Sequence, residues 1–151
     1  MAAIDKAIYY LNIKPRTKAQ VIRYLEQKDF PPEEIQEAIQ ELESYRYIDD
    51  FNYAQMYFEV AFEKGKGIAR IKRELAEKGV DRQIIEEAFE ELESVPDQYE
   101  TALQTGRKIL LEAGEFDPDQ KQKIKGRIAR RLASKGFSSD IVYSVIRELM
   151  D

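Results

Sequence analysis

Hydrophobic residues recur along most of the chain at intervals of three and four positions, which is the spacing of one face of an α-helix. Ile71 and Leu75 lie four residues apart, and Ile124, Ile128 and Leu132 have the same spacing. The period-two alternation of β-branched residues that is typical of strands does not occur. The pattern therefore predicts an all-α protein. The expected helices span residues 2–13, 17–28, 32–45, 49–64, 67–78, 82–94, 97–113, 118–135 and 138–150.

Several helix boundaries carry sequence signals of their own. Thr17 and Gln20 have the spacing of a capping box, in which a hydroxyl and a side-chain amide satisfy free backbone groups at a helix start. Pro118 suits the first turn of a helix because the N–H that it lacks would have no partner there. Gly79 and Gly136 each follow a lysine, as expected where a helix ends in a left-handed residue.

The chain also contains an internal repeat. A shift of 50 residues aligns residues 21–25 with residues 71–75, and a shift of 57 aligns Lys78-Gly79-Val80 with Lys135-Gly136-Phe137. Both alignments keep the hydrophobic positions in register, and the second also matches the helix-ending turn. One basic residue recurs in all three copies, as Arg23, Arg73 and Arg130.

We therefore expect three tandem three-helix repeats, helix-turn-helix-like units that span residues 1–46, 47–95 and 96–151. A single unit of this size is too small to bury a deep core, so neighbouring units should pack on one another. Stacked repeats tend to form extended bodies with long binding surfaces. The prediction is an elongated, curved molecule.

Composition removes several classes of function. The 151-residue chain contains no cysteine and no histidine, which excludes disulfides, thiolate zinc sites and nucleophiles activated by histidine. Paired carboxylates such as Glu90 and Glu91 lack an apolar pocket that would tune their acidity. We expect a protein that is not an enzyme and binds no metal. The N-terminus has no features of a signal peptide, and no apolar stretch approaches the roughly 20 residues of a membrane span. We therefore expect a cytoplasmic protein without a membrane partner.

The charges are unevenly distributed along the chain. The formal net charge of −5 alone argues against a polyanionic partner. However, residues 121–135 contain seven basic residues and no acidic one, and residues 64–78 contain six basic and two acidic residues. Such runs favour contact with phosphates or an acidic protein surface, although they could also be solvated faces that pair with acidic helices of this chain. The candidate binding residues are Lys64, Lys66, Arg70, Lys72, Arg73, Lys121, Lys123, Lys125, Arg127, Arg130 and Arg131.

Other residues in these regions have structural explanations. Gly65 and Gly67 lack the spacing of a P-loop, so nucleotide binding is not expected, although their backbone amides could meet an oxyanion. Asp49 and Asp50 could hold a metal, but an aspartate before Phe51 is better explained as a helix N-cap. The recurring arginines are explained by bridging to a neighbouring helix. Six tyrosines lie among acidic residues, which favours packing between repeats over stacking on bases. They are Tyr9, Tyr10, Tyr45, Tyr47, Tyr53 and Tyr57.

Two stretches of the middle repeat have a distinctive order of residues. Residues 47–54 read Tyr-Ile-Asp-Asp-Phe-Asn-Tyr-Ala, and residues 64–75 read Lys-Gly-Lys-Gly-Ile-Ala-Arg-Ile-Lys-Arg-Glu-Leu. Together with Lys78-Gly79-Val80, they resemble the RecX family of bacterial proteins that regulate the RecA recombinase. The resemblance covers nearly the whole chain. Residues 55–63 depart from the commoner family pattern, because they are apolar and acidic where many members carry an arginine-rich run.

The resemblance implies an all-helical, modular protein that binds the RecA–DNA filament and lodges in its groove. Such a protein modulates, and usually inhibits, the ATPase and strand exchange of RecA in DNA repair, recombination and the SOS response. The resemblance implies no enzymatic activity and no cofactor. Contact with single-stranded or duplex DNA would be weak or made through the filament, and we expect a monomer.

Two other hypotheses fit the same residues. The chain could be a stand-alone nucleic-acid-binding module in which the second helix of each unit is the recognition helix, and it would then bind duplex DNA without RecA. It could also be a helical adaptor whose charges serve only solubility. In that case, reversing Lys123, Arg127, Arg130 and Arg131 to Glu would leave partner binding unchanged.

Overall fold

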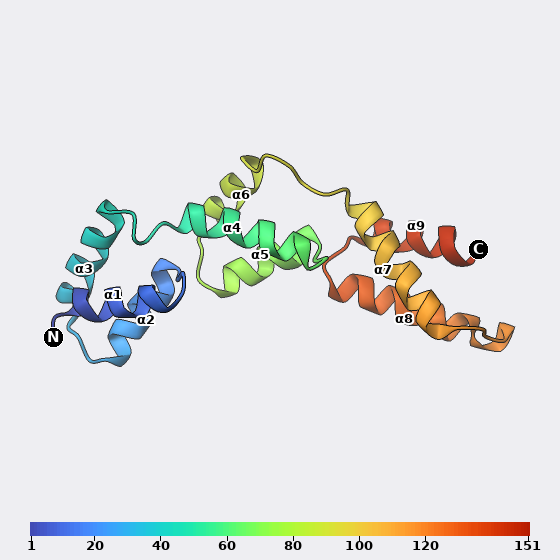
Figure 1. The fold of residues 1–151 in the computed structure, drawn as a ribbon, viewed down its shortest axis with the longest axis horizontal. Coiled ribbons are helices and arrows are strands. Elements are labelled where there is room, and N and C mark those ends of the chain that lie inside the picture. The colour runs from blue at the N-terminus through green and yellow to red at the C-terminus, as the bar shows by residue number, and fades with distance from the viewer. The chain divides into compact units, whose positions relative to one another are not determined.

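The computed structural model describes residues 1–151 and consists of nine α-helices, one short 3₁₀ turn and no strand (Figure 1). The all-α prediction is confirmed. The helices are α1 (Ala3–Ile13), α2 (Lys18–Gln27), α3 (Pro32–Ser44), α4 (Asp50–Glu63), α5 (Ile68–Glu77), α6 (Arg82–Glu90), α7 (Gln98–Ala113), α8 (Lys121–Ser134) and α9 (Ser139–Met150). The 3₁₀ turn η1 (Pro118–Gln120) directly precedes α8.

Two predicted boundaries differ from the structure by more than one residue. The sixth helix was expected to reach residue 94 but ends at Glu90. Its C-terminal end carries Glu90, Glu91 and Glu93, whose negative charges are unfavourable at that end of the helix dipole, and Pro96 disfavours helical backbone at the residue before it. The eighth helix was expected to begin at residue 118, but Pro118 instead starts η1.

The capping signals at the starts and ends of the second helices are confirmed. The Thr17 hydroxyl accepts a hydrogen bond from the Gln20 amide at 3.2 Å, and the Gln20 side-chain oxygen accepts one from the Thr17 amide at 3.0 Å. Gly79 and Gly136 have φ values of +90° and +94°, so both end their helices in the left-handed region.

The internal repeat is visible in the positions of the buried residues. Val21, Ile71 and Ile128 align under the two shifts, and so do Leu25, Leu75 and Leu132. All six side chains have no exposed surface. The second helix of every repeat therefore buries side chains at the same two positions. Burial of each such side chain stabilises a fold by about 1.5–3 kcal/mol.

The first and the third repeats each have a hydrophobic core of their own. α1, α2 and α3 pack around Ala7, Leu25 and Leu42 at the N-terminal end of the chain. α7, α8 and α9 pack around Leu103 and Ile128 at the C-terminal end. In Figure 1 these two groups of helices are the blue-to-teal and the gold-to-red parts of the ribbon.

The residues of the chain form two compact units that divide the middle repeat. The first unit comprises Met1–Tyr57 and Glu74–Leu92, and the second comprises Phe58–Arg73 and Glu93–Asp151. The division falls inside α4 and α5, so one end of this helix pair belongs with the first repeat and the other end with the third. Each unit therefore holds one contact region between neighbouring repeats. No helix of the chain combines the length and the apolar character that a membrane crossing requires.

Candidate functional site

In the first unit, the start of α2 packs against the turn that ends α5. The Thr17 hydroxyl donates a hydrogen bond to the backbone oxygen of Lys78 at 2.7 Å. Gly79 lies so close to Ala19 that an added Cβ atom would collide with the Ala19 side chain. Glycine at this turn is therefore required by close approach as well as by its left-handed backbone. We call this contact region the first joint.

The first joint has a second connection, through a carboxylate. The Asp50 side chain accepts a hydrogen bond from the backbone amide of Lys18 at 2.9 Å. Lys18 is the first residue of α2, so its amide has no partner within the helix. Asp50 therefore caps a helix of the preceding repeat. Burial raises the pKa of the Asp50 carboxyl, and the bond from the Lys18 amide partly opposes that effect.

The second unit contains a corresponding contact between the start of α5 and the turn that ends α8. The Gly67 amide donates to the backbone oxygen of Lys135 at 2.6 Å, and the Ile68 amide donates to the Gln98 side-chain oxygen at 3.1 Å. A Cβ atom on Gly67 would lie 2.6 Å from the carbonyl carbon of Gly136. We call this region the second joint. The repeat shifts align Thr17 with Gly67 and Lys78 with Lys135, so both joints use the same positions of the repeat.

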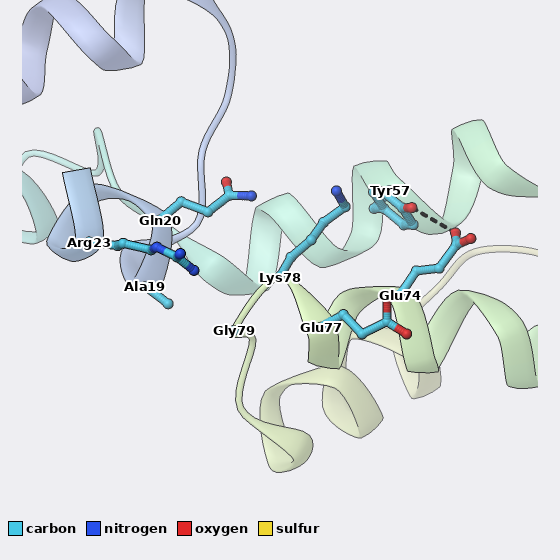
Figure 2. Close-up of a pocket in the computed structure, with 8 residues that line it drawn as sticks. All are labelled: Ala19, Gln20, Arg23, Tyr57, Glu74, Glu77, Lys78 and Gly79. Carbon is cyan, nitrogen blue, oxygen red and sulfur yellow. Dashed lines mark hydrogen bonds between the residues drawn. The ribbon is translucent and has the colours of Figure 1, made fainter. Parts of the chain in front are cut away.

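A pocket of about 540 Å³ lies beside the first joint, and its lining is mixed in charge (Figure 2). Gln20 and Arg23 reach it from α2, and Glu74, Glu77 and Lys78 line it at the end of α5. The Tyr57 hydroxyl of α4 donates a hydrogen bond to Glu74 at 2.7 Å, and the Lys78 ammonium lies 5.6 Å from the centre of the Tyr57 ring.

A pocket of about 280 Å³ lies at the second joint, and no acidic side chain lines it. Its lining residues are Lys64, Lys66, Arg70, Arg131, Ser134 and Lys135. We call it the basic pocket. Four of these residues align with lining residues of the first pocket: Arg70 with Gln20, Arg131 with Glu74, Ser134 with Glu77 and Lys135 with Lys78. Two aligned positions of the repeat therefore carry carboxylates, Glu74 and Glu77, beside the first joint and none beside the second.

Lys135 is the central cation of the basic pocket. Its ammonium donates to the backbone oxygen of Lys64 at 3.4 Å, while the Arg70 guanidinium donates to the backbone oxygen of Ser134 at 3.4 Å. Burial lowers the pKa of Lys135, and the nearby charges of Arg131, Arg70, Lys108 and Lys66 lower it further. The pocket thus concentrates positive charge from both sides of the joint.

The positive surface continues along α8 into an adjoining groove of about 690 Å³. Arg127 and Arg130 line this groove from α8, and Lys108 lines it from α7. The groove also contains Glu63 and Glu112, so it is mixed where the basic pocket is not. An arrangement of this kind can bind an anion through ammonium and guanidinium donors.

Comparison with known proteins identifies the family. Three family models match in chain order: the first three-helix domain of RecX over residues 3–42, the second over residues 49–88 and the third over residues 96–146. A crystal structure of RecX from Lactobacillus salivarius has 30% sequence identity and a TM-score of 0.82, and the match covers 97% of this chain and 94% of that chain. The chain belongs to the RecX family. The three matched domains also confirm the predicted architecture of three-helix repeats.

Curated relatives of this RecX-family chain are longer than it is. A regulatory protein RecX from Streptococcus agalactiae is 33% identical over 143 residues, which is 94% of this chain and 53% of the relative. A regulatory protein RecX from Listeria monocytogenes is 31% identical over 146 residues, which is 96% of this chain and 53% of the relative. The chain therefore spans about half the length of the curated relatives it matches.

The predicted basic residues of this RecX-family chain fall into three groups. Lys64, Lys66, Arg70 and Arg131 line the basic pocket, and Arg127 and Arg130 line the groove beside it. Lys125 instead forms an ion pair with Asp151 at 2.6 Å, which also lowers the pKa of the Asp151 carboxyl. The remaining four residues line neither the basic pocket nor the groove. They are Lys72, Arg73, Lys121 and Lys123.

Two residues of the pocket region were absent from the predicted set. Lys135 belongs to the same basic run as Arg131. The sequence feature that could have identified it is its place directly before Gly136, where the helix ends in a left-handed residue. Lys108 lies in α7, outside both runs, and nothing in the sequence indicates its approach to α8. The prediction that the Gly65 and Gly67 amides could meet an oxyanion is wrong, because they donate to the backbone oxygens of Phe62 and Lys135.

The structural explanations given for the acidic residues and the tyrosines have different outcomes. Asp49 caps its own helix by accepting from the Asn52 amide at 3.0 Å, as predicted, whereas Asp50 caps α2. Tyr10 stacks on Tyr24 with ring centres 4.1 Å apart. Three of the six tyrosines are largely exposed, so packing does not explain them all. They are Tyr9, Tyr45 and Tyr47.

Proposed function

We propose that this chain binds the RecA–DNA filament, lodges in its groove and inhibits RecA ATPase and strand exchange in DNA repair, recombination and the SOS response. Membership of the RecX family supports the proposal, since its relatives are named regulatory proteins. The observation that carries it is the meeting of two sequence-distant basic stretches at the second joint, where Arg70 and Arg131 line one pocket. The chain acts as a cytoplasmic monomer by binding rather than by catalysis.

The mechanism that fits these features is many modest contacts made at once. Ammonium and guanidinium groups along the basic pocket and the α8 groove meet phosphates or acidic side chains of the filament. Because such contacts are linked in one chain, their sum exceeds the affinity of each. A chain that bridges neighbouring RecA protomers in this way resists the change that accompanies ATP turnover.

The decisive test adds the chain at substoichiometric ratios to the cognate RecA on single-stranded DNA. The expected result is a loss of ATP hydrolysis and strand exchange that increases with the amount added. Albumin at equal mass controls for nonspecific protein effects. Unchanged rates at every ratio would remove the proposal.

The basic pocket also favours a second candidate function, stand-alone binding of nucleic acid. Fluorescence anisotropy with labelled duplex and single-stranded DNA, without RecA and at several salt concentrations, separates the two. Independent binding through about four to six phosphates gives a fall of log affinity against log salt with a slope of roughly −0.9 per phosphate on duplex DNA. If the chain binds DNA weakly alone and tightly once RecA is added, the result favours binding to the RecA–DNA filament.

A further inference from the structure

The cations of the basic pocket come from both sides of the second joint. Lys64, Lys66 and Arg70 belong to the middle repeat, whereas Arg131 and Lys135 belong to α8 of the third. The hydrogen bond from the Gly67 amide to the Lys135 carbonyl fixes the separation of the two backbones. The fold therefore holds these side chains close together. The positive charges of Arg131 and Arg70 repel that of Lys135 across the joint.

The first joint shows that the backbone geometry does not require this charge. It forms corresponding contacts, with a hydrogen bond to the Lys78 carbonyl and a close approach at Gly79. Nevertheless it has Glu74 and Glu77 at the positions of Arg131 and Ser134. A joint of this design is therefore compatible with a mixed lining, so the all-basic lining of the second joint has another cause.

The positively charged groups that line the basic pocket are side chains, and the start of α5 adds no donor to them. The Gly67 and Ile68 amides already donate to the Lys135 carbonyl and to the Gln98 side chain. Two guanidinium groups and three ammonium groups line the pocket, and both kinds of group bind phosphate oxygens. The pocket volume of about 280 Å³ is several times the 30 Å³ of a water molecule in the liquid, which leaves room for a phosphate group with its first waters.

The lining also favours nucleic acid over an acidic peptide. No apolar side chain lines the basic pocket, so a peptide would gain charge contacts but no hydrophobic burial there. The positive surface extends from the pocket through Arg130 and Arg127 along the α8 groove. Glu63 and Glu112 also line this groove, so the cations follow its α8 side. A row of cations along one helix suits a strand that carries a phosphate at every nucleotide.

We propose that the basic pocket binds a phosphate of a nucleic-acid strand and that the bound phosphate holds α5 and α8 together at the second joint. The anion offsets the repulsion between Arg70, Arg131 and Lys135, so the joint closes more firmly when the strand is bound. The inference rests on the proposed function only for the source of the strand. It concerns a property of the chain itself and needs no RecA to be tested.

The test measures amide hydrogen exchange of the full chain by NMR at fixed ionic strength, with and without a 15-nucleotide oligodeoxythymidylate. Exchange of the Gly67 amide should slow at least about threefold on binding, because a ligand of the closed joint stabilises it. The Lys18 amide of the first joint is the internal control and should not change. Binding of the strand without slower exchange at Gly67 would overturn the coupling.

Two variants with the same change of charge test the site itself. Arg131→Glu should weaken oligonucleotide binding by about tenfold and lower the salt slope by about 1, because a phosphate contact is lost. It should also abolish the slowing at Gly67. Lys123→Glu alters the same helix outside both the pocket and the groove, and should change affinity by less than about threefold. Equal effects of the two variants would overturn the assignment of the pocket.

A further pair of measurements covers the remaining outcomes. Poly-glutamate at equal charge concentration should not slow exchange at Gly67, and an equal effect would overturn the choice of nucleic acid. The double variant Glu74→Arg, Glu77→Ser gives the first joint the residues of the second. It should add slowing by the oligonucleotide at the Lys18 amide, and an unchanged Lys18 amide would contradict the role of pocket charge. If the chain does not inhibit RecA but the oligonucleotide slows exchange at Gly67, the proposed function is wrong and this inference still holds.

Discussion

Gly136 has two independent reasons to be a glycine. Its φ of +94° lies in the left-handed region, and a Cβ atom there would lie 2.5 Å from the Arg70 backbone nitrogen. Gly65 also has a positive φ, of +77°, but a Cβ atom there would meet only the Lys135 ammonium at 3.5 Å, an ordinary contact. Comparing substitutions at Gly136 and Gly65 therefore separates the cost of a left-handed backbone from the cost of a steric clash at the joint.

We predict that Gly136→Ala lowers the free energy of unfolding by about 3 kcal/mol, as backbone strain and a steric clash add. Gly65→Ala should lower it by about 1 kcal/mol, from backbone strain alone. Urea denaturation followed by circular dichroism measures both. Equal losses for the two variants would show that the second joint is not closely packed at Gly136.

A second prediction at this scale concerns the charge of Lys135. Its pKa is lowered in the folded chain, so folding disfavours the charged ammonium. The penalty is present at neutral pH and is relieved as the pH rises through the lowered pKa towards 10.5. The melting temperature of Lys135→Gln should therefore equal or exceed that of the unmodified chain at pH 7, and the difference should shrink at alkaline pH.

The check on this prediction is a pair of melting curves, at pH 7 and at pH 10, for Lys135→Gln and for Lys123→Gln. Lys123 lies on α8 and lines neither the basic pocket nor the groove, so Lys123→Gln is the matched control for removing one lysine charge from this helix. The prediction is contradicted if the melting temperature of Lys135→Gln, compared with that of the unmodified chain at the same pH, is lower at pH 7 than at pH 10.

At the scale of the element, the starts of the second helices depend on side chains from the next repeat. Asp50 is the first residue of α4 and caps α2, and Gln98 is the first residue of α7 and caps α5. Each cap satisfies an amide that the helix itself cannot. A helix start in one repeat is therefore completed only when the following repeat is folded.

We predict that Asp50→Ala destabilises the start of α2 by about 1 kcal/mol, because the Lys18 amide loses its acceptor while the N-cap Thr17 remains. Asp50→Asn keeps an acceptor oxygen for the Lys18 amide and removes a buried charge, so it should be close to neutral. Exchange of the Lys18 amide is the direct measurement, and it should speed up roughly fivefold in the Ala variant, as 1 kcal/mol implies. Equal exchange rates in the two variants would show that Asp50 is not the cap.

At the scale of the whole molecule, the sequence predicts more of the fold than of the site. The spacing of Ile71 and Leu75 and the recurring Lys-Gly turn are local signals, and they gave the helices, the repeat and the family. The end of α6 was missed because the hydrophobic spacing continues to Leu92, two residues beyond the last residue of the helix. The boundaries of the three repeats at residues 46 and 95 stay a prediction.

The site depends on contacts that no local pattern encodes. Both basic runs were predicted as binding segments, but the meeting of Arg70 with Arg131 requires the joint between α5 and α8. Lys72 and Arg73 lie in the same run as Arg70 and line neither basic surface, since successive residues of a helix point in different directions. Lys108 and Asp50 act on helices distant in sequence, so composition and spacing could not assign them.

The paired joints have a consequence for how such a chain could lengthen over evolution. The middle repeat offers the start of α5, at Gly67, to the repeat that follows it, and its Lys78–Gly79 turn to the repeat before it. An extra copy of residues 47–95 inserted after residue 95 would carry both contact surfaces, the start of α5 and the Lys78–Gly79 turn, together with the Asp50 carboxylate. A gene duplication of this segment would therefore need no newly invented surface, and only the charges beside each turn would be left for selection to change.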